Sequence, residues 1–327
     1  MFMLMLSLLA GEFIFDKAPF ASCHASTVVE LRDGDRMAAW FGGSDEGRPD
    51  VAIWGSRRAG EHWTEPVELA REPGVAAYNP VLFYTQDRRL WLYYKFGPSP
   101  STWTAARRFS SDEGKTWSKV EHLPAGIYGP IRAKPLVMGD GVVVSGTSVE
   151  SYRSWAAWIE RSVDQGRTFT RIGPIAFDAA APAHETHGLI QPSVVRLGPR
   201  HLRLYARSTR SIGKICVADS FDDGLTWTVA HALDVLNPNS GIDAVALRDG
   251  RVVLVYNDSD SKRTPLNLAI SSDGEHFRNF LTLEDAAGEY SYPAMIQTAA
   301  GDLEITYTWN RKKIKYARVA LADIPQR

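Results

Sequence analysis

The sequence predicts an all-β chain folded as a single six-bladed β-propeller domain over residues 1–327. Two repeats carry this prediction, namely four copies of a short turn motif and six strand–turn–strand hairpins. Aromatic residues make up 11% of the chain, and no long amphipathic helical pattern interrupts the repeats. Because the repeat runs evenly along the sequence, one domain is expected rather than two.

The turn motif has the pattern Ser-x-Asp-x-Gly-x-Thr-Trp/Phe. Its copies lie at residues 110–117, 162–169, 220–227 and, in reduced form, 271–277, with 52, 58 and 51 residues between successive aspartates. The Asp carboxylate can accept hydrogen bonds from turn amides, and Gly permits a positive φ. The final aromatic side chain is expected to plug the turn onto the body of the fold. Four copies at this spacing indicate a repeat architecture.

Six hairpins share one plan, in which two short apolar runs flank a turn that often carries Asp-Gly. They occupy residues 26–42, 80–96, 135–149, 192–209, 244–258 and 293–309. A third strand follows each hairpin, so a unit of about 54 residues suits one four-stranded blade. The sixth blade then needs an outer strand, which we expect from Met1–Ala10 or from Phe13–Phe15.

Charge and composition argue against several classes of partner. The net charge is −1, and the only basic cluster is Arg311–Lys313, so nucleic-acid binding is not expected. The apolar run Met1–Ala10 is too short to span a bilayer and has no Lys or Arg before it. We therefore favour a closing strand over a signal peptide, expect no membrane partner, and favour a cytoplasmic location over a secreted or periplasmic one.

The cysteines and histidines give no metal pattern. Cys23 and Cys216 lie far apart without metal-ligand spacing and are interpreted as buried reduced thiols. His184 and His187 flank Glu185-Thr186 in a segment that is interpreted as a loop. No metal or cofactor is expected, and the sequence does not indicate an oligomeric state.

Propeller geometry locates the expected site. The first strand of each blade lines the central channel and pairs with the second, so the residues before strand one and after strand two meet at one mouth. These positions hold varied polar residues: His24, Asn79, Arg132, Lys134, Gln191, Asp243, Glu289, Tyr290 and Tyr292 before first strands, and Asp45, Asp50, Lys95, Glu150, Arg207, Arg263 and Trp309 after second strands. Loops on a rigid scaffold commonly carry function, so this mouth is the predicted substrate site.

The turn motif and the hairpins together resemble the sialidase (neuraminidase) superfamily, of the bacterial exo-sialidase type, over the whole chain. The resemblance implies that arginines hold a substrate carboxylate, and Arg207 in Leu204-Tyr-Ala-Arg207 and Arg263 in Arg263-Thr-Pro-Leu-Asn-Leu268 match two of three such arginines. It implies a tyrosine nucleophile matched by Tyr290 in Tyr290-Ser291, with Tyr292 close behind. It also implies an acid/base aspartate in Ser44–Asp50, matched by Asp45 with Asp50 as reserve.

Three positions depart from the pattern of that family. His24 stands where the first arginine is expected, Gln191 replaces the glutamate that assists the tyrosine, and Thr308 replaces a further glutamate. The first expectation is glycoside hydrolysis at an acidic terminal sugar. An alternative is β-elimination from a uronic acid with His24 and a tyrosine as base and acid, similar to propellers that act on rhamnose–glucuronate linkages.

A non-catalytic glycan-binding propeller is the third possibility. It would use rim aromatics to stack on sugar faces; the candidates are Tyr78, Tyr94, Trp103, Tyr152, Trp155 and Trp309. A convergent set of Tyr290, Asp45, His24 and two arginines favours an enzyme over a binding module. In each case the expected partner is a glycan or a small acidic sugar.

Overall fold

The computed structural model describes residues 11–178 and 184–326, and these residues form an all-β structure. The only helix among them is a single 3₁₀ turn, η1 (Leu321–Asp323). No helix of the described residues is long and apolar enough to cross a membrane. The all-β prediction is thus confirmed, whereas the expectation for Met1–Ala10 falls outside the described residues.

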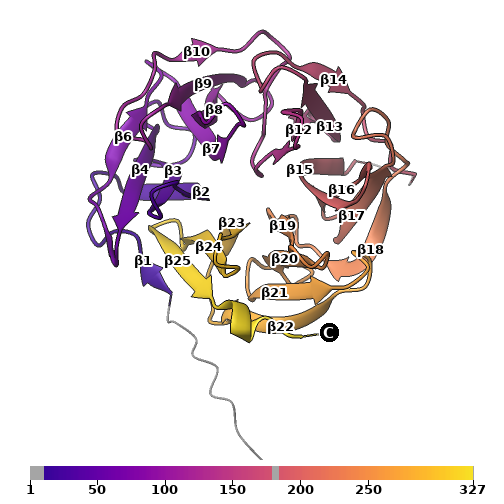
Figure 1. Cartoon of the computed structure of the whole chain (residues 1–327). Coiled ribbons are helices and arrows are strands. Elements are labelled where there is room, and N and C mark those ends of the chain that lie inside the picture. The colour runs from indigo at the N-terminus through magenta and orange to yellow at the C-terminus, as the bar shows by residue number, and fades with distance from the viewer. Residues whose placement is uncertain (1–10, 179–183, 327) are drawn as a thin grey trace, which may run out of the picture.

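Within the described residues, six groups of strands, here called units 1 to 6, follow one another around a common centre (Figure 1). Units 1 and 2 contain β2 (Ser22–Glu30), β3 (Arg36–Gly43), β4 (Ala52–Ala59), β5 (His62–Trp63) and β6 (Val67–Ala70), then β7 (Ala76–Tyr84), β8 (Leu90–Gly97), β9 (Thr104–Ser110) and β10 (Glu121–His122). Units 3 and 4 contain β11 (Leu136–Val137), β12 (Val143–Glu150), β13 (Ser154–Ser162) and β14 (Thr170–Ile172), then β15 (His187–Gly198), β16 (His201–Ser208), β17 (Lys214–Ser220) and β18 (His231–Leu236). Units 5 and 6 contain β19 (Asp243–Ala246), β20 (Val252–Asn257), β21 (Leu266–Ser271) and β22 (Arg278–Glu284), then β23 (Tyr290–Gln297), β24 (Leu303–Trp309) and β25 (Lys313–Val319).

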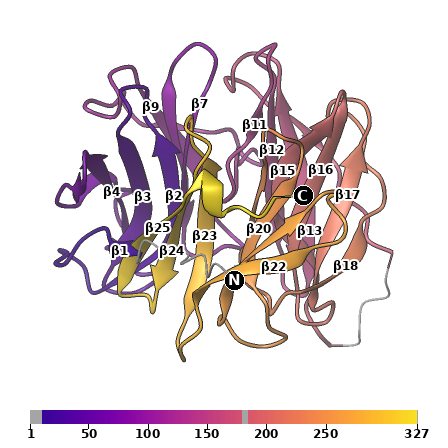
Figure 2. The same ribbon diagram turned by 60° about the horizontal axis from the view of Figure 1, so that its bottom comes forward.

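Each predicted hairpin forms an antiparallel pair, and its first strand is the innermost strand of its unit (Figures 1 and 2). The strand β1 (Glu12–Phe13) pairs with β25, with Glu12 opposite Tyr316. A residue from the Phe13–Phe15 segment therefore completes the sheet of unit 6, as the second alternative predicted. Units 3 and 4 also share a short parallel contact between β13 and β15, which joins them into one eight-stranded sheet.

The turn motif has the predicted hydrogen bonds. In the copy of unit 2, Asp112 accepts hydrogen bonds from Ser110 Oγ at 2.7 Å and from the Thr116 amide at 2.8 Å, and Gly114 has a φ of 81°. The copies around Asp164, Asp222 and Asp273 repeat this arrangement. The aromatic residues that follow pack against buried apolar clusters, so the turns are part of the core; they are Trp117, Phe169, Trp227 and Phe277.

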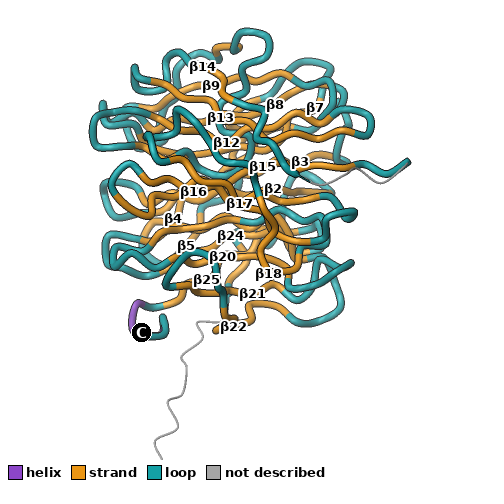
Figure 3. Tube along the Cα trace, turned by 90° about the vertical axis from the view of Figure 1, so that its right-hand side faces the viewer, coloured by secondary structure: helices purple, strands orange, loops and turns teal. Residues whose placement is uncertain are grey.

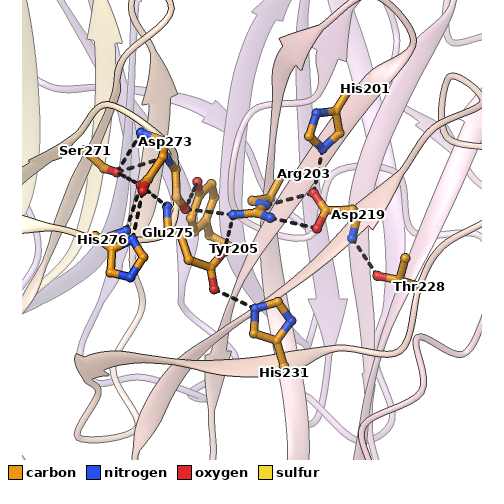
Figure 4. Close-up of polar contacts among 11 residues, drawn as sticks. His201, Arg203, Tyr205, Asp219, Thr228, His231, Ser271, Asp273, Glu275 and His276 are labelled. Carbon is orange, nitrogen blue, oxygen red and sulfur yellow. Dashed lines mark hydrogen bonds and ion pairs between the residues drawn. The ribbon is translucent and has the colours of Figure 1, made fainter.

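An arginine of each of the first four units reaches the turn motif of the next unit. We call these contacts the arginine latches: Arg57 to the carbonyl oxygen of Glu113, Arg107 to that of Gly166, Arg161 to that of Asp223 and Arg203 to that of Gly274. In the Arg203 latch a carboxylate, Asp219, holds the guanidinium through two 2.8 Å bonds, and Tyr205 Oη also donates to the Gly274 carbonyl at 2.7 Å (Figure 4). The latches fix neighbouring units side by side in the ring that Figure 1 shows face-on and Figure 3 shows from the side.

Four of the innermost strands carry the same β-bulge. The register shifts after His24, Tyr78, Ile190 and Ser291, and each bulge contains one residue with positive φ: Ala25, Asn79, Gln191 and Tyr292. A bulge adds one residue to a strand and re-aims the side chain that it carries, and bulges are frequent beside active sites. The same device thus sets the direction of Asn79, Gln191 and Tyr292 at equivalent places in units 2, 4 and 6.

Candidate active site

Tyr292 lies at the centre of a cluster of polar side chains. Its hydroxyl oxygen accepts hydrogen bonds from Arg207 Nη1 at 2.8 Å and from Gln191 Nε2 at 3.2 Å. Tyr292 belongs to unit 6, and its two partners belong to unit 4, so this contact crosses the centre of the molecule and bypasses unit 5. The structure therefore brings Tyr292, Arg207 and Gln191 together at the predicted channel mouth.

Cations and an imidazole surround the Tyr292 ring. The guanidinium carbons of Arg132, Arg207 and Arg263 lie 5.5, 5.7 and 5.7 Å from its centroid, within the range of cation–π attraction. The ring of His24 packs against it at a centroid distance of 4.2 Å. These residues come from units 1, 3, 4 and 5, so the cluster exists only when the units are assembled.

Arg132 holds the bulge of unit 6 in place. Its Nη1 and Nη2 atoms donate hydrogen bonds, both at 2.9 Å, to the carbonyl oxygens of Pro293 and Ile242. Arg132 precedes β11 of unit 3, so its side chain spans the channel to reach the backbones of units 5 and 6. Its Nε atom is buried and has no partner among the described residues.

A fourth arginine, Arg311, enters the cluster through Glu289. The Glu289 carboxylate accepts hydrogen bonds from Arg263 Nη1 at 2.8 Å and from Arg311 Nε at 3.1 Å. Burial acts to raise the pKa of Glu289, but the hydrogen bonds and charges of these two arginines outweigh it and lower that pKa. Arg311 also pairs with Glu46 in the loop after β3. Sequence reasoning missed Arg311 because it stands in a basic run that resembles a solvated surface.

His24 is buried, and its pKa is lowered by the positive charges around it. Burial is the largest cause that holds its pKa well below the usual range, and the charges of the four arginines act in the same direction. The imidazole is therefore neutral near pH 7, and its Nδ1 atom has no partner among the described residues. A partly buried site with four arginines and a neutral histidine is suited to an anionic ligand.

Three further carboxylates were predicted at this mouth, and the charge of Arg207 acts on one of them, Glu150. Glu150, at the end of β12, is half-buried, and burial raises its pKa against the charge of nearby Arg207. Asp45 and Asp50 lie in an exposed loop. Asp45 Oδ1 accepts the Glu46 amide at 2.9 Å, whereas Asp50 accepts both the amide and the hydroxyl of Ser44 at 2.8 Å and closes the loop.

The structure does not bring Tyr290 to the cluster. Only 2% of Tyr290 is exposed, and it belongs to the apolar core that units 5 and 6 share, with its ring centroid 6.5 Å from that of Trp309. Burial raises the pKa of its hydroxyl, and Glu284 and Asp285 on the outer side of unit 5 add to this effect. Trp309 packs in turn on Phe13 at 5.3 Å, so both residues belong to the core rather than to the channel mouth.

Several other predicted residues support the scaffold. Lys95 is fully buried and donates to the Pro130 carbonyl at 2.6 Å, between units 2 and 3. Asp243 is also buried and accepts hydrogen bonds from Ser193 Oγ at 2.8 Å and from the Met295 amide at 2.9 Å, which ties together units 4, 5 and 6. Asn79 is 4% exposed and occupies the bulge of unit 2, and Lys134 lines a separate cavity described below.

A sequence signal distinguishes the two tyrosines. Each of the pairs Asn79-Pro80, Lys134-Pro135, Gln191-Pro192 and Tyr292-Pro293 stands at the same place in its unit. Aligned on the proline, Tyr292 corresponds to Gln191, whereas Tyr290 lies two residues earlier.

No group of three or more His, Cys, Asp or Glu side chains within residues 11–178 and 184–326 is arranged to hold a metal ion.

An all-β ring of hairpin units with a repeated Ser-x-Asp-x-Gly turn defines a repeat protein of the BNR type, and the chain belongs to this family. The model of the BNR repeat-like domain matches residues 34–305. The fold is similar to that of a protein of unknown function from Dyadobacter fermentans, with a TM-score of 0.80 at 16% identity over 95% of this chain and 98% of that one.

Solved sialidases share the fold as well. A mutant of the NanB sialidase from Streptococcus pneumoniae superposes with a TM-score of 0.78 at 14% identity, over 96% of this chain and 71% of that one. The intramolecular trans-sialidase from Ruminococcus gnavus gives a TM-score of 0.73 at 13% identity, over 98% and 99% of the two chains. At these identities the similarity establishes a sialidase-like fold and leaves the reaction to be argued from the site.

Proposed function

We propose that the protein is a six-bladed β-propeller enzyme of the sialidase-like type that hydrolyses a glycan at a terminal sugar bearing a carboxylate. The observation that carries the proposal is the group of four arginines around Tyr292 and His24. The pairing of β1 with β25 supports closure of the propeller. The sialidase-like fold supports the substrate class.

Arg207 and Arg263 are the proposed clamps for the carboxylate. Arg207 donates hydrogen bonds from Nε to Asn239 and from Nη1 to Gln191 and Tyr292. Arg263 donates one from Nη1 to Glu289. Their partners hold both guanidinium groups in one orientation while leaving donors for a ligand. Planar guanidinium groups bind carboxylates with two parallel hydrogen bonds, so preorganised arginines favour a sugar acid over a neutral sugar.

Tyr292 replaces Tyr290 as the proposed nucleophile. Two N–H donors point at its oxygen, and such donors stabilise negative charge there. In the proposed reaction the Tyr292 hydroxyl gives its proton to solvent as its oxygen bonds to the anomeric carbon, the bond to the leaving oxygen breaks, and Asp45 gives that oxygen a proton. Water then attacks the anomeric carbon and gives its proton to the Asp45 carboxylate, and the Tyr292 oxygen leaves and takes a proton back from solvent.

Elimination from a uronic acid is the second candidate, and one observation favours it. The Tyr292 hydroxyl has Gln191 and Arg207 as hydrogen-bond partners rather than a carboxylate, and a neutral His24 packs on its ring. Neutral His24 would remove the proton at C5 while the arginines stabilise the resulting enolate, after which the C4–O bond breaks and the leaving oxygen takes a proton from the Tyr292 hydroxyl.

The test is turnover of two substrate pools, sialosides and uronate-containing glycans. Released sialic acid supports the hydrolase, and an ultraviolet absorbance from a new C4–C5 double bond supports the lyase. Tyr292→Phe should abolish whichever activity is found, and Tyr290→Phe is the matched control because it removes a hydroxyl outside the cluster. If the wild-type protein turns over neither pool, the result contradicts the proposal and favours a binding propeller.

A further inference from the structure

A second cavity opens at the other mouth of the channel. Its volume is about 440 Å³, and the far ends of the innermost strands β11, β15, β19 and β23 line it. These residues follow Gln191 and Tyr292 along their strands toward the hairpin turns, so the cavity faces away from the arginine cluster. Its wall is largely apolar; side chains that form it include Val137, Val195, Val245, Met295 and Ile296.

Arg132 lies near both this cavity and the candidate active site, because its guanidinium carbon is 5.5 Å from the centroid of the Tyr292 ring and its charge acts on Lys134. Its side chain crosses the channel from unit 3 to the carbonyl oxygens of Ile242 and Pro293. Asp243 in β19, directly after Ile242, and Met295 in β23, two residues after Pro293, line the cavity. The cavity shares no lining residue with the cluster around Tyr292, so the inference drawn from it is independent of the function proposed for that cluster.

A buried ammonium group without a partner lies beside this cavity. Lys134 lines it, and its Nζ atom is buried with no hydrogen bond to any described residue. Burial is the main cause that lowers the pKa of Lys134 to about 8; the charge of Arg132 lowers it further, and that of Asp243 opposes both. An uncompensated charge in such a place is costly, so an anionic partner would stabilise it.

Asp243 does not serve as that partner. Its two oxygens accept hydrogen bonds from Ser193 Oγ, the Ala244 amide and the Met295 amide. Arg132 and Lys134 together carry two positive charges against the single charge of Asp243. Arg196, the other cation of the wall, lies 3.5 Å from Asp223. The floor of the cavity therefore keeps one positive charge in excess.

We propose that this cavity binds an aliphatic monocarboxylate, with the carboxylate on Lys134 and the apolar chain along the valine, isoleucine and methionine side chains of the wall. The volume falls within the range of small-molecule sites, which are mostly apolar with few polar anchors. A hydrogen bond between an ammonium and a carboxylate is stronger than one between neutral groups, so the acid should be preferred over its alcohol.

Calorimetric titration with octanoate and octanol tests the proposal. The wild-type protein should bind octanoate about 10- to 100-fold more tightly than octanol. Lys134→Met, which keeps chain length but removes the charge, should bind both equally. Lys262→Met, an exposed lysine near the other mouth, is the matched control and should keep the preference. Equal binding of both ligands by the wild type, or no binding of either, would overturn the proposal.

A second readout needs no variant. At pH 9 the Lys134 amine is mostly neutral, and a bound carboxylate should restore its proton, so binding should take up a proton. Titrations in two buffers with different ionisation enthalpies measure this uptake. Octanoate binding without proton uptake would place the ligand away from Lys134. If inorganic phosphate binds in a manner that depends on Lys134 and octanoate does not bind, the proposal that the wall of the cavity holds an apolar chain is wrong.

Discussion

Replacing Arg203 with methionine should destabilise the protein by about 3 kcal/mol. Arg203 and Asp219 are both buried, with 11% and 10% of their side chains exposed, and are joined by two 2.8 Å bonds. Removing one partner of such a pair costs about 3–5 kcal/mol because the other charge stays buried. We expect the lower end, because His201 Nε2 remains 2.7 Å from Asp219.

Thermal unfolding provides the assay. An unfolding entropy of about 2.1 cal/mol/K per residue gives roughly 0.7 kcal/mol/K for a chain of 327 residues, so about 3 kcal/mol corresponds to a fall in Tm of about 4 °C. Arg200→Met is the matched control, because Arg200 is 67% exposed in its side chain and lies 3.5 Å from Asp223. Surface pairs contribute about 0–1 kcal/mol. Equal falls in Tm for Arg203→Met and Arg200→Met would refute the claim that the Arg203 latch stabilises the fold.

Three further predictions concern the site and the turns. Tyr292→Phe should lower turnover by at least about 10³-fold while Tyr290→Phe retains it, and the reverse order of rates would return the role to Tyr290. Arg311→Met should raise KM for an acidic substrate more than it lowers kcat, because Arg311 acts through Glu289; an unchanged KM would contradict this. Hydrogen bonds from Thr116 and Ser110 lower the pKa of Asp112 to about 2 against the effect of burial. Its contribution to stability is therefore present above about pH 4 and lost as the pH falls toward 2, so urea unfolding of Asp112→Asn should differ from wild type at pH 5 and converge near pH 2. A difference in the free energy of unfolding that stays constant from pH 5 to pH 2 would contradict a role of the Asp112 carboxylate in stability.

The hairpins and turns were predictable because their chemistry is local. Asp112, Gly114 and Thr116 sit at fixed offsets, and the bonds that they form involve only the motif itself. The outer strand of unit 6 was predictable from the need to pair β25. The parallel contact between β13 and β15 was not, since it rests on two residue pairs, Ser154 with His187 and Trp155 with Gly188, without a sequence pattern.

The site was only partly predictable. The ends of strands in a ring converge whatever the exact register of each strand. Four of the predicted residues therefore lie in the same cluster: His24, Gln191, Arg207 and Arg263. The choice between Tyr290 and Tyr292 depends on a bulge with φ of 50° at Tyr292, and a bulge alters which residues of a strand face the centre. Alternation alone cannot reveal that shift, and only the proline alignment indicates it.

The central claim is that the arginine cluster around Tyr292 binds the carboxylate of a sugar. The most direct measurement compares the affinity of the acidic sugar that the protein accepts with that of its methyl ester, in the wild type and in Arg207→Met. The account predicts that the wild type binds the acid at least about 10-fold more tightly than the ester, and that Arg207→Met loses most of this preference. Equal affinity of the wild type for acid and ester would contradict it.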